Sequence, residues 1–251
     1  MGELLRTERL TKYYGVVSAA SDLELGFQEG VLTSIIGPNG AGKTTFIHLL
    51  TGHVKPDRGK IFFLGENITK LPTHLRVQKG ISRSFQIGDI FPRLSVRENI
   101  QIPVVASLGL GMRFFKLLDR DSVVQDRVAS LLEEVGLRDK SEVPAGSLSH
   151  GDQRLLEIAL AMAPEPKLLF LDEPTAGMNP VERVRILENI RKLSQRRSTT
   201  FVIVEHDMDI VFALSDRIVV LHRGSVIADG RPEEIKENRE VREIYLGEEF
   251  L

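Results

Sequence analysis

The chain has 251 residues, of which 42% are hydrophobic and none is cysteine. A chain of this length buries roughly 70–75% of its unfolded surface, so we expect one domain or one domain with a sizeable insertion. Its 33 basic and 35 acidic residues leave a formal charge of -2, which argues against nucleic acid as the main partner. The lack of cysteine excludes a disulfide framework and thiolate metal sites.

No stretch of the sequence has the pattern of a membrane or export segment. The start, MGELLRTERLTKYYG, is charged throughout and lacks the apolar core of a secretory signal. The longest uncharged run, residues 99–112, is broken by Pro103, Gly109 and Gly111 and is too short to span a bilayer. We therefore expect a protein that is not embedded in a membrane on its own account.

The first third of the chain alternates short β-rich runs with turns. Residues 31–37 are mostly β-branched and closed by glycine, which predicts a buried strand. Residues 43–52 predict a helix that stops at Gly52. Further strands are predicted over residues 59–69 and 80–86.

Helix signals dominate from residue 87 to about residue 147. Asp121 is a typical N-cap and Gly136 a typical stop for a helix between them. One face of that helix is apolar and carries Val124, Val128, Leu131, Leu132 and Val135. We interpret this region as a helical insertion between strands.

The α/β alternation returns after Ser149. Residues 167–172 form an unbroken apolar run, as a central parallel strand does. Asn179 at the N-cap and Pro180 at the first helical position begin another helix. The remaining predicted elements are a helix over 150–162, a strand over 199–206, a helix over 207–215 and a hairpin over 216–230 that turns at Arg223-Gly224.

Residues 37–45, GPNGAGKTT, match G-x-x-x-x-G-K-[ST] between a predicted strand and a predicted helix. Glycines let backbone N–H groups wrap around phosphate oxygens, and the helix N-terminus adds a positive dipole. In this pattern Lys43 reaches the β- and γ-phosphates, and Thr44 places its hydroxyl on Mg²⁺. A glycine-rich turn is the alternative, but the context on both sides favours a nucleotide site formed by Gly37, Pro38, Asn39, Gly40, Ala41, Gly42, Lys43, Thr44 and Thr45.

An acidic pair ends the strand predicted over residues 167–172. A carboxylate at Asp172 is costly there unless it has a partner, and a Mg²⁺ ion that carries nucleotide phosphates is such a partner. Pro174 keeps Glu173 out of helical geometry, which lets its carboxylate polarise a water for attack on the γ-phosphate. The alternative is an acid pair that only caps a helix, and the phosphate loop disfavours it.

His206 ends the strand predicted over residues 199–206. Ligands of parallel sheets bind at the carboxyl ends of the strands, so we expect His206 to face the same phosphates, although a lone histidine is ordinarily structural. Gln86 ends the strand predicted over residues 80–86. It either reaches the same place or is a solvated loop amide.

The stretch SLSHGDQRLLEIALA, residues 147–161, has two interpretations. Ser149 as an N-cap, with Asp152 at capping-box spacing, explains an ordinary amphipathic helix. The same geometry places the N–H groups of His150 and Gly151 at a positive helix end, which suits a γ-phosphate from another subunit. Asp152 is then expected to point back to its own helix, and the role of His150 stays open.

Together these motifs resemble those of the ATP-binding cassette family over nearly the whole chain. Residues 37–45 resemble the Walker A loop, residues 168–172 Walker B, and LSHGD the family signature. The resemblance implies catalytic roles for Glu173, His206 and Lys43. It implies that Mg²⁺ is held by Thr44, Gln86 and Asp172. It implies that Tyr14, with Tyr13 as a rival, stacks on adenine, and that the ATP of a partner is contacted by Ser149, His150 and Gly151.

The resemblance also implies an α/β fold, with a P-loop NTPase RecA-like core, an N-terminal antiparallel β region and an inserted helical subdomain. Within a single domain over 1–251, we expect the β region and Walker A core at 1–86, the helical subdomain with the signature at 87–162, and the Walker B core with the C-terminal segment at 163–251. ATP and Mg²⁺ are the implied cofactors, bound between the subunits of a head-to-tail dimer. Candidates for a permease-facing groove are residues 86–100 and 103–112, with packing inside the helical subdomain as the alternative.

The finer pattern resembles the Liv-type ATPases, which drive branched-chain amino acid import, in LSHGDQRLLEIALAM, DEPTAGMNPVE, VEHDMDIV and REIYLGEEF. This implies a homo- or heterodimer with a second cassette ATPase, two transmembrane permease subunits and, indirectly, an extracytoplasmic solute-binding protein. It implies a peripheral place on the cytoplasmic face of the inner or plasma membrane and no nucleic acid. The alternatives are a urea or amide importer, a lipopolysaccharide exporter, a soluble non-transport cassette and a small-molecule kinase.

Two departures from the broad family pattern bear on the contacts across such a dimer. His150 and Asp152 replace the usual Gly and Gln of the signature. Asn179 stands where a cross-dimer aspartate is common. Both forms are similar to those of the Liv-type branch.

Overall fold

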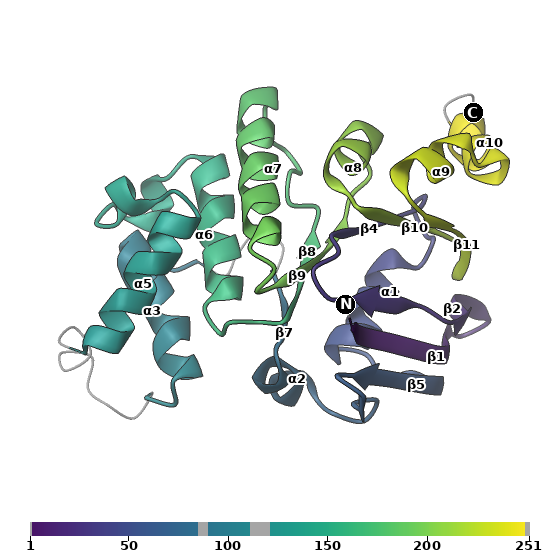
Figure 1. Ribbon diagram of the computed structural model, residues 1–251, viewed down its shortest axis with the longest axis horizontal. Helices are drawn as coiled ribbons and strands as arrows, with labels where there is room; N and C mark the ends of the chain where they lie inside the picture. The colour runs from purple at the N-terminus through teal and green to yellow at the C-terminus, as the bar shows by residue number, and fades with distance from the viewer. Residues whose placement is uncertain (1, 85–89, 111–120, 249–251) are drawn as a thin grey trace.

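Two β-sheets and a layer of helices make up the protein in the computed structural model, which describes residues 2–84, 90–110 and 121–248 (Figure 1). The first sheet has the strands β1 Glu3–Tyr14, β2 Val17–Leu23, β3 Gly26–Gln28, β5 Arg58–Phe63 and β6 Glu66–Asn67. Its order is β2-β1-β5-β6, with β3 also paired to β1, and its pairs are antiparallel. The predicted N-terminal antiparallel region is thereby confirmed.

The second sheet has the strands β4 Thr33–Ile36, β7 Ile81–Arg83, β8 Leu168–Asp172, β9 Thr200–Val204, β10 Arg217–His222 and β11 Ser225–Gly230. They lie in the order β11-β10-β4-β9-β8-β7, and every neighbouring pair is parallel except β10 with β11. Strands β4, β8 and β9 are buried along their whole length, because other elements cover both faces of this sheet. The predicted hairpin is confirmed, and Arg223 and Gly224 form its turn with φ of 46° and 80°.

The helices are α1 Lys43–Thr51, α2 Thr73–Lys79, α3 Val96–Ser107, α5 Ser122–Glu134, α6 His150–Met162, α7 Pro180–Gln195, α8 Met208–Leu214, α9 Pro232–Glu237 and α10 Arg239–Glu248, with short turns η1 Arg138–Lys140 and η2 Ala145–Ser147. Figure 1 shows α3, α5 and α6 grouped at one end of the molecule, with α7 between them and the second sheet. This group is the predicted helical insertion. Of the helices within the described ranges, none is long and apolar enough to cross a bilayer.

Side-chain caps fix where several helices begin. The predicted cap Asp121 accepts hydrogen bonds from two backbone N–H groups of α5, and Asn179 does the same for α7, with Pro180 at its first position. Ser95 and Glu98 form a complete capping box at the start of α3. Each such cap is worth about 1 kcal/mol, so the starts of these helices are set locally.

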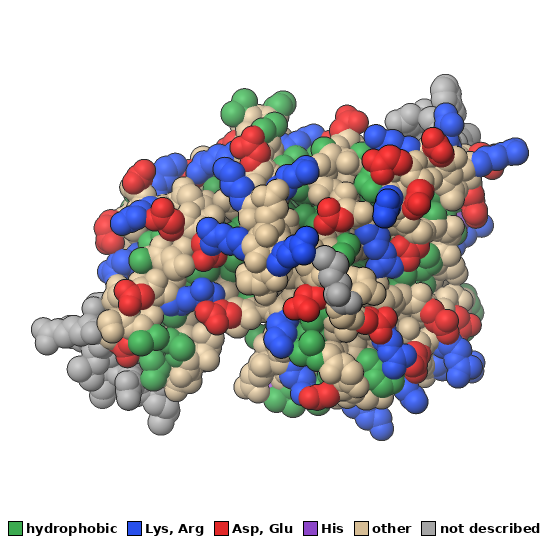
Figure 2. Space-filling model, in the orientation of Figure 1, with side chains coloured by type: hydrophobic (Ala, Val, Ile, Leu, Met, Phe, Trp, Pro, Cys, Tyr) green, Lys and Arg blue, Asp and Glu red, His purple; other side chains and the backbone are tan. Residues whose placement is uncertain are grey.

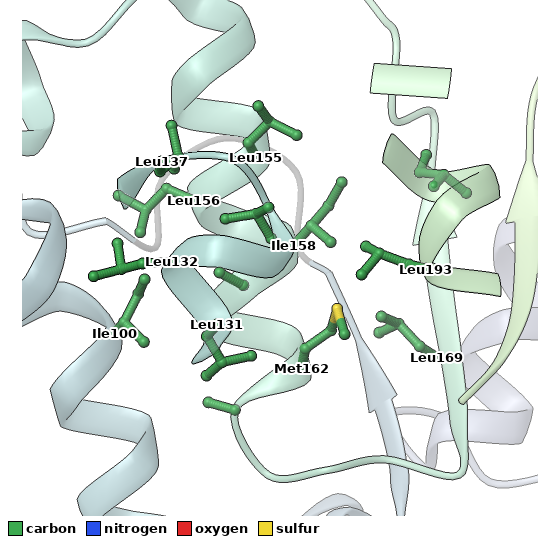
Figure 3. Packing of buried hydrophobic residues seen from close by; sticks show 14 of the residues in the cluster. Ile100, Leu131, Leu132, Leu137, Leu155, Leu156, Ile158, Met162, Leu169 and Leu193 are labelled. Atoms are coloured by element: carbon green, nitrogen blue, oxygen red, sulfur yellow. The ribbon is translucent and has the colours of Figure 1, made fainter. Parts of the chain in front are cut away.

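Two large hydrophobic clusters lie on opposite faces of the second sheet at β8, and a smaller one joins β4 and β10 to α8 and α9. Along β8, Leu169 and Leu171 face one cluster, and Leu168 and Phe170 face the other, as alternation along a strand requires. The first cluster joins the sheet to α7, α6, α5 and α3, as Figure 3 shows for Ile100, Leu131, Leu132, Leu137, Leu155, Leu156, Ile158, Met162, Leu169 and Leu193. The second packs the same strands against α1 and the antiparallel sheet. Helix α6 therefore shares its core with the strand that carries Asp172.

Candidate functional site

Three parallel strands end at one edge of the second sheet, and the predicted nucleotide residues follow them. Val204, the last residue of β9, pairs with Asp172 of β8, and it also pairs with Ile35 near the end of β4. The expected parallel arrangement of these strands is confirmed. The loop at Gly37, the acidic pair and His206 therefore leave the sheet on the same side, where ligands of such sheets bind.

The loop after β4 approaches its neighbours too closely for a side chain at two points. A Cβ on Gly37, whose φ is 152°, would lie 2.1 Å from the carbonyl oxygen of Leu221. A Cβ on Gly42, whose φ is 99°, would lie 2.2 Å from the carbonyl oxygen of Ala19. Only glycine fits both the space and the backbone angle of Gly42. The loop is thus held between β10 and β2.

Lys43 begins α1 and lies inside this loop. Its ammonium donates to the carbonyl oxygens of Gly37 and Pro38, and 7% of the residue is exposed. Within the described chain, no side chain caps α1 at Gly42. The first-turn N–H groups and the positive end of the helix dipole therefore stand open toward the loop. A concave loop with a buried ammonium and a helix N-terminus suits a polyphosphate.

Tyr14 is the last residue of β1, at the tip of the β1–β2 hairpin. It pairs with Val17 across the hairpin and is 50% exposed, whereas Tyr13 is 44% exposed. The ammonium of Lys12 is 5.7 Å from the centroid of the Tyr14 ring. The same hairpin approaches the phosphate loop through the carbonyl oxygen of Ala19 in β2, next to Gly42.

Asp172 is a buried carboxylate whose partner is an arginine that the sequence analysis did not single out. Nη2 of Arg83 lies 2.6 Å from Oδ2 of Asp172, and both side chains are buried. Arg83 ends β7 and pairs with Phe170 of the neighbouring strand. The Asp172 carboxylate, which we expected to need a partner at the end of its strand, therefore has Arg83 of the same chain as that partner.

Glu173 has a backbone conformation that non-glycine residues rarely adopt. Its φ is 45°, and the left-handed region costs such a residue about 1–2 kcal/mol. Its N–H donates to the carbonyl of Val204 at 2.9 Å. Its carboxylate Oε1 lies 2.7 Å from Nε2 of His206. The structure thus brings the two residues together at the edge where the phosphate loop begins.

Glu205 supports this arrangement from the neighbouring strand end. It is buried, and its Oε1 accepts hydrogen bonds from the N–H and the hydroxyl of Thr175 at 3.2 and 2.7 Å. Burial raises the pKa of Glu205, against the lowering effect of the hydrogen bonds from Thr175 and from the backbone of His206. The turn after Glu173 is therefore tied to the segment that carries His206.

The predicted second phosphate element lies at the start of α6. Ser149 caps the helix by accepting the N–H of Asp152 at 3.2 Å, and Ser149 and His150 are exposed. The buried Asp152 carboxylate is bound by Lys140, by Arg185 at 2.7 Å and by the Ser149 hydroxyl at 3.0 Å. Burial acts to raise the pKa of Asp152, but these hydrogen bonds outweigh it and lower the pKa. The carboxylate is thus held by two cations and by the cap of its own helix, as expected, and Oε1 of Glu182 accepts the N–H of Gly151 at 3.4 Å.

The two phosphate elements lie in different halves of the chain. Figure 1 shows α6 in the helical group and α1 next to the antiparallel sheet, with α7 and β8 between the two helices. One chain therefore cannot close both elements around one phosphate. Gln86, the remaining expected site residue, lies outside the described residues, and the strand predicted to reach it ends at Arg83.

Three residues around the acidic pair carried no functional signal in the sequence: Arg83, Glu205 and Arg154. Arg154 is three residues before Glu157, a spacing that is typical of surface ion pairs on helices. In the structure both side chains are buried, with Nη1 and Oε2 2.6 Å apart. Burial of this kind depends on what packs over a helix, which local spacing does not encode.

A groove of about 890 Å³ opens between the helical group and the rest of the molecule. It is lined from α2, β7, α3 and α6, and Figure 2 shows the molecule hollowed at its lower edge there. Both stretches expected to face a permease contribute to its wall, the first through Phe91 and Asn99 and the second through Pro103 and Ser107. Glu157 reaches the same groove from α6.

Comparisons with known proteins agree with this geometry. A family model described as ABC transporter matches residues 20–176, and one described as Branched-chain amino acid ATP-binding cassette transporter matches residues 225–251. The probable branched-chain amino acid transport ATP-binding protein LivG of Archaeoglobus fulgidus is 39% identical over 98% of this chain and 96% of its own. The lipopolysaccharide export system ATP-binding protein LptB of Acidithiobacillus ferridurans is 35% identical over 100% of this chain and 99% of its own.

The fold also has a solved counterpart. The ADP conformation of MJ1267, an ATP-binding cassette of an ABC transporter, matches with a TM-score of 0.85 and 31% identity over 98% of this chain and 100% of its own. The first family model covers more than half of the chain, and the relatives match it almost end to end. This chain belongs to the ATP-binding cassette transporter family and is an ATPase.

Proposed function

We propose that this chain is the ATP-hydrolysing subunit of an importer for branched-chain amino acids. The near full-length similarity to LivG of Archaeoglobus fulgidus carries the proposal, and the branched-chain amino acid family model over residues 225–251 supports it. The lipopolysaccharide export relative is less similar. Import is therefore favoured over export.

The geometry supports separate roles in ATP hydrolysis for the residues at the edge of the second sheet. Lys43 and the N–H groups of residues 37–45 bind the β- and γ-phosphates, and their positive charge stabilises the negative charge that shifts during transfer. Glu173 accepts a proton from the water that attacks the γ-phosphate. His206, 2.7 Å from Glu173, orients that carboxylate. Tyr14 covers the adenine.

The residues beside the loop fit a magnesium ion. Thr44 and Asp172 offer a hydroxyl and a carboxylate oxygen, the donors that Mg²⁺ prefers, and Arg83 pairs with one oxygen of the Asp172 carboxylate, Oδ2. Bound with the nucleotide, the ion would neutralise charge on the β- and γ-oxygens. Thr44 and Asp172 would hold the ion, and Gln86 is the expected third ligand.

A second cassette ATPase, either a copy of this chain or a relative, completes each ATP site. Ser149, His150 and Gly151 form a capped helix N-terminus that suits a phosphate, and they lie in the other half of the chain from α1 (Figure 1). A head-to-tail pair of subunits places each such end against the nucleotide of the other. Lys140 and Arg185 balance the charge of the Asp152 carboxylate at this end, and the Glu182 carboxylate that accepts the N–H of Gly151 at 3.4 Å would give way to the phosphate.

The groove between the helical group and the core is the docking site for the permease. It is largely apolar at Phe91, Ile102 and Pro103, and it has polar groups at Asn99 and Glu157, a mixture that suits a protruding element of a membrane subunit. The ATPase then sits at the cytoplasmic face of the membrane against two permease subunits, and it meets the solute-binding protein only through them.

Uptake of labelled leucine tests the proposal. A strain that lacks this gene should lose uptake, the wild-type gene should restore it, and Lys43→Ala should not, because the loop loses its cation. Restored urea uptake with no effect on leucine would contradict the assigned solute. Unchanged ATP affinity of purified Lys43→Ala would contradict the phosphate-loop role by itself.

A further inference from the structure

Arg154 of α6 forms hydrogen bonds to the backbone of the turn that carries Glu173. It is 7% exposed, and its Nη2 donates to the carbonyl oxygens of Asp172 at 2.6 Å and Glu173 at 2.9 Å. Its Nε donates to the carbonyl of Pro174 at 3.2 Å. One guanidinium therefore binds three consecutive carbonyls, beginning at the last residue of β8.

This turn needs such a partner. Three successive carbonyl dipoles that point at one place repel each other unless a cation lies among them, and Glu173 holds a left-handed backbone angle that a glutamate does not prefer. The neighbouring strand fixes the N–H of Glu173, and His206 meets its carboxylate. Arg154 fixes the carbonyl side of the same residue, so it completes the restraint on the direction of the carboxylate.

The other side of the guanidinium is anchored on α6 itself. Nη1 of Arg154 lies 2.6 Å from Oε2 of Glu157, one turn further along the helix. The exposed helix end at Ser149 and His150 lies within five residues of Arg154 on the same rigid helix. A shift of α6 against β8 would therefore move the turn that holds Glu173.

We propose that Arg154 is a positioning residue that couples the placement of α6 to the orientation of the Glu173 carboxylate. The coupling rests on the proposed role of Glu173 and goes beyond it. When the start of α6 docks on the nucleotide of the partner subunit, Arg154 holds the Glu173 of its own subunit in the hydrolytic orientation. Each ATP site thereby senses closure of the other one.

Arg154→Lys is the informative change, because lysine keeps the charge but has no planar fork to bind three carbonyls. We expect kcat for ATP hydrolysis to fall by about tenfold or more, which corresponds to about 1.4 kcal/mol of activation free energy. The KM for ATP and the affinity for a fluorescent ATP analogue should stay within about twofold, because the phosphate loop is untouched. Arg127→Lys is the matched control, since Arg127 also bonds a main-chain carbonyl of α6, that of Met162, but at the far end of the helix.

The same assay in a Glu173→Gln background separates positioning from general stability. If Arg154 acts through Glu173, adding Arg154→Lys should not slow the residual single-turnover rate further, because the positioned group is already gone. An equal loss in both backgrounds, or a wild-type kcat in Arg154→Lys while Glu173→Gln is inactive, would overturn the inference. Wild-type hydrolysis in Glu173→Gln would instead overturn the proposed role of Glu173, whatever Arg154→Lys does.

Discussion

Arg76 and Arg154 are both buried, and each binds a run of main-chain carbonyls, but they do so in different parts of the molecule. The guanidinium of Arg76 donates to the carbonyls of Leu49, Leu50, Thr69 and Leu71 at 2.7–3.0 Å. These acceptors include the last turn of α1 and lie in the same packed unit as α2, which carries Arg76. Arg154 instead reaches from α6 in the helical group to the end of β8 in the core.

The two arginines also differ in how their charge is balanced. Within the described ranges Arg76 has no acidic partner, and burial lowers the pKa of its guanidinium to about 10, so it stays charged at neutral pH. Arg154 has Glu157 at 2.6 Å. The comparison indicates that the same kind of hydrogen bonding either holds neighbouring turns of one region together or links the helical group to the end of β8, depending on where the acceptors lie. Stability should therefore depend on Arg76 and the catalytic rate on the Arg154 turn.

The largest effect on the hydrolysis rate should come from a change at Glu173, whose carboxylate Arg154 positions. Glu173→Gln removes the proton acceptor while keeping the shape of the side chain, so hydrolysis should fall by about 10²- to 10⁴-fold. ATP binding should remain, and the ATP-bound dimer should accumulate in size-exclusion chromatography. Glu165→Gln is the control, because Glu165 has a similar φ of 54° but lies away from the phosphate loop, between α6 and β8. Equal rates for the two variants would refute the catalytic assignment.

Arg76→Met should act on stability and leave the rate alone. It deprives four buried or partly buried carbonyls of their donor, and an unsatisfied buried group costs about 1–3 kcal/mol. Relaxation of the surrounding backbone and water that enters the site will recover part of this cost. We therefore expect the free energy of unfolding to fall by about 3–5 kcal/mol in urea titrations. The kcat of the folded fraction should stay within twofold. Arg138→Met on the exposed η1 turn is the control and should cost less than about 0.5 kcal/mol.

A drop in kcat for Arg76→Met under conditions where the protein is fully folded would contradict the view that Arg76 affects stability alone. It would mean that the end of α1, and not only the turn after β8, sets the geometry of the phosphate loop.

The sequence predicted what is encoded locally. The glycines of residues 37–45, the caps at Asp121 and Asn179, and the parallel strands that end near Asp172 all follow from spacing and residue type, and the structure has them. The helical insertion was visible from the apolar face of the helix after Asp121. These features need only neighbours along the chain.

The long-range restraints around the site could not be predicted in the same way. Three buried arginines have partners that are distant in the sequence, either carboxylates or main-chain carbonyls: Arg76, Arg83 and Arg154. Every residue has a main-chain carbonyl, so the residue types do not indicate which carbonyls will accept a hydrogen bond. Arg154 with Glu157 has the spacing of a solvated ion pair, yet the fold buries both. The left-handed angle of Glu173 is likewise set from two other segments, the end of β9 with Val204 and His206, and α6 with Arg154.

The smallest effect should come from Glu157→Gln, which removes the charge partner of Arg154 but leaves its three carbonyl acceptors. Arg76 indicates that a buried guanidinium can stay in place with carbonyls alone, so Arg154 should remain bound to the turn. We expect kcat to fall by about threefold, which corresponds to about 0.65 kcal/mol of activation free energy. The loss should be measured by steady-state hydrolysis beside Glu133→Gln, an exposed acid on α5. A loss as large as that of Arg154→Lys would show that the Glu157 charge, and not the carbonyl run, holds Arg154 in place, and Arg76 would then be a poor guide to how the turn after β8 is built.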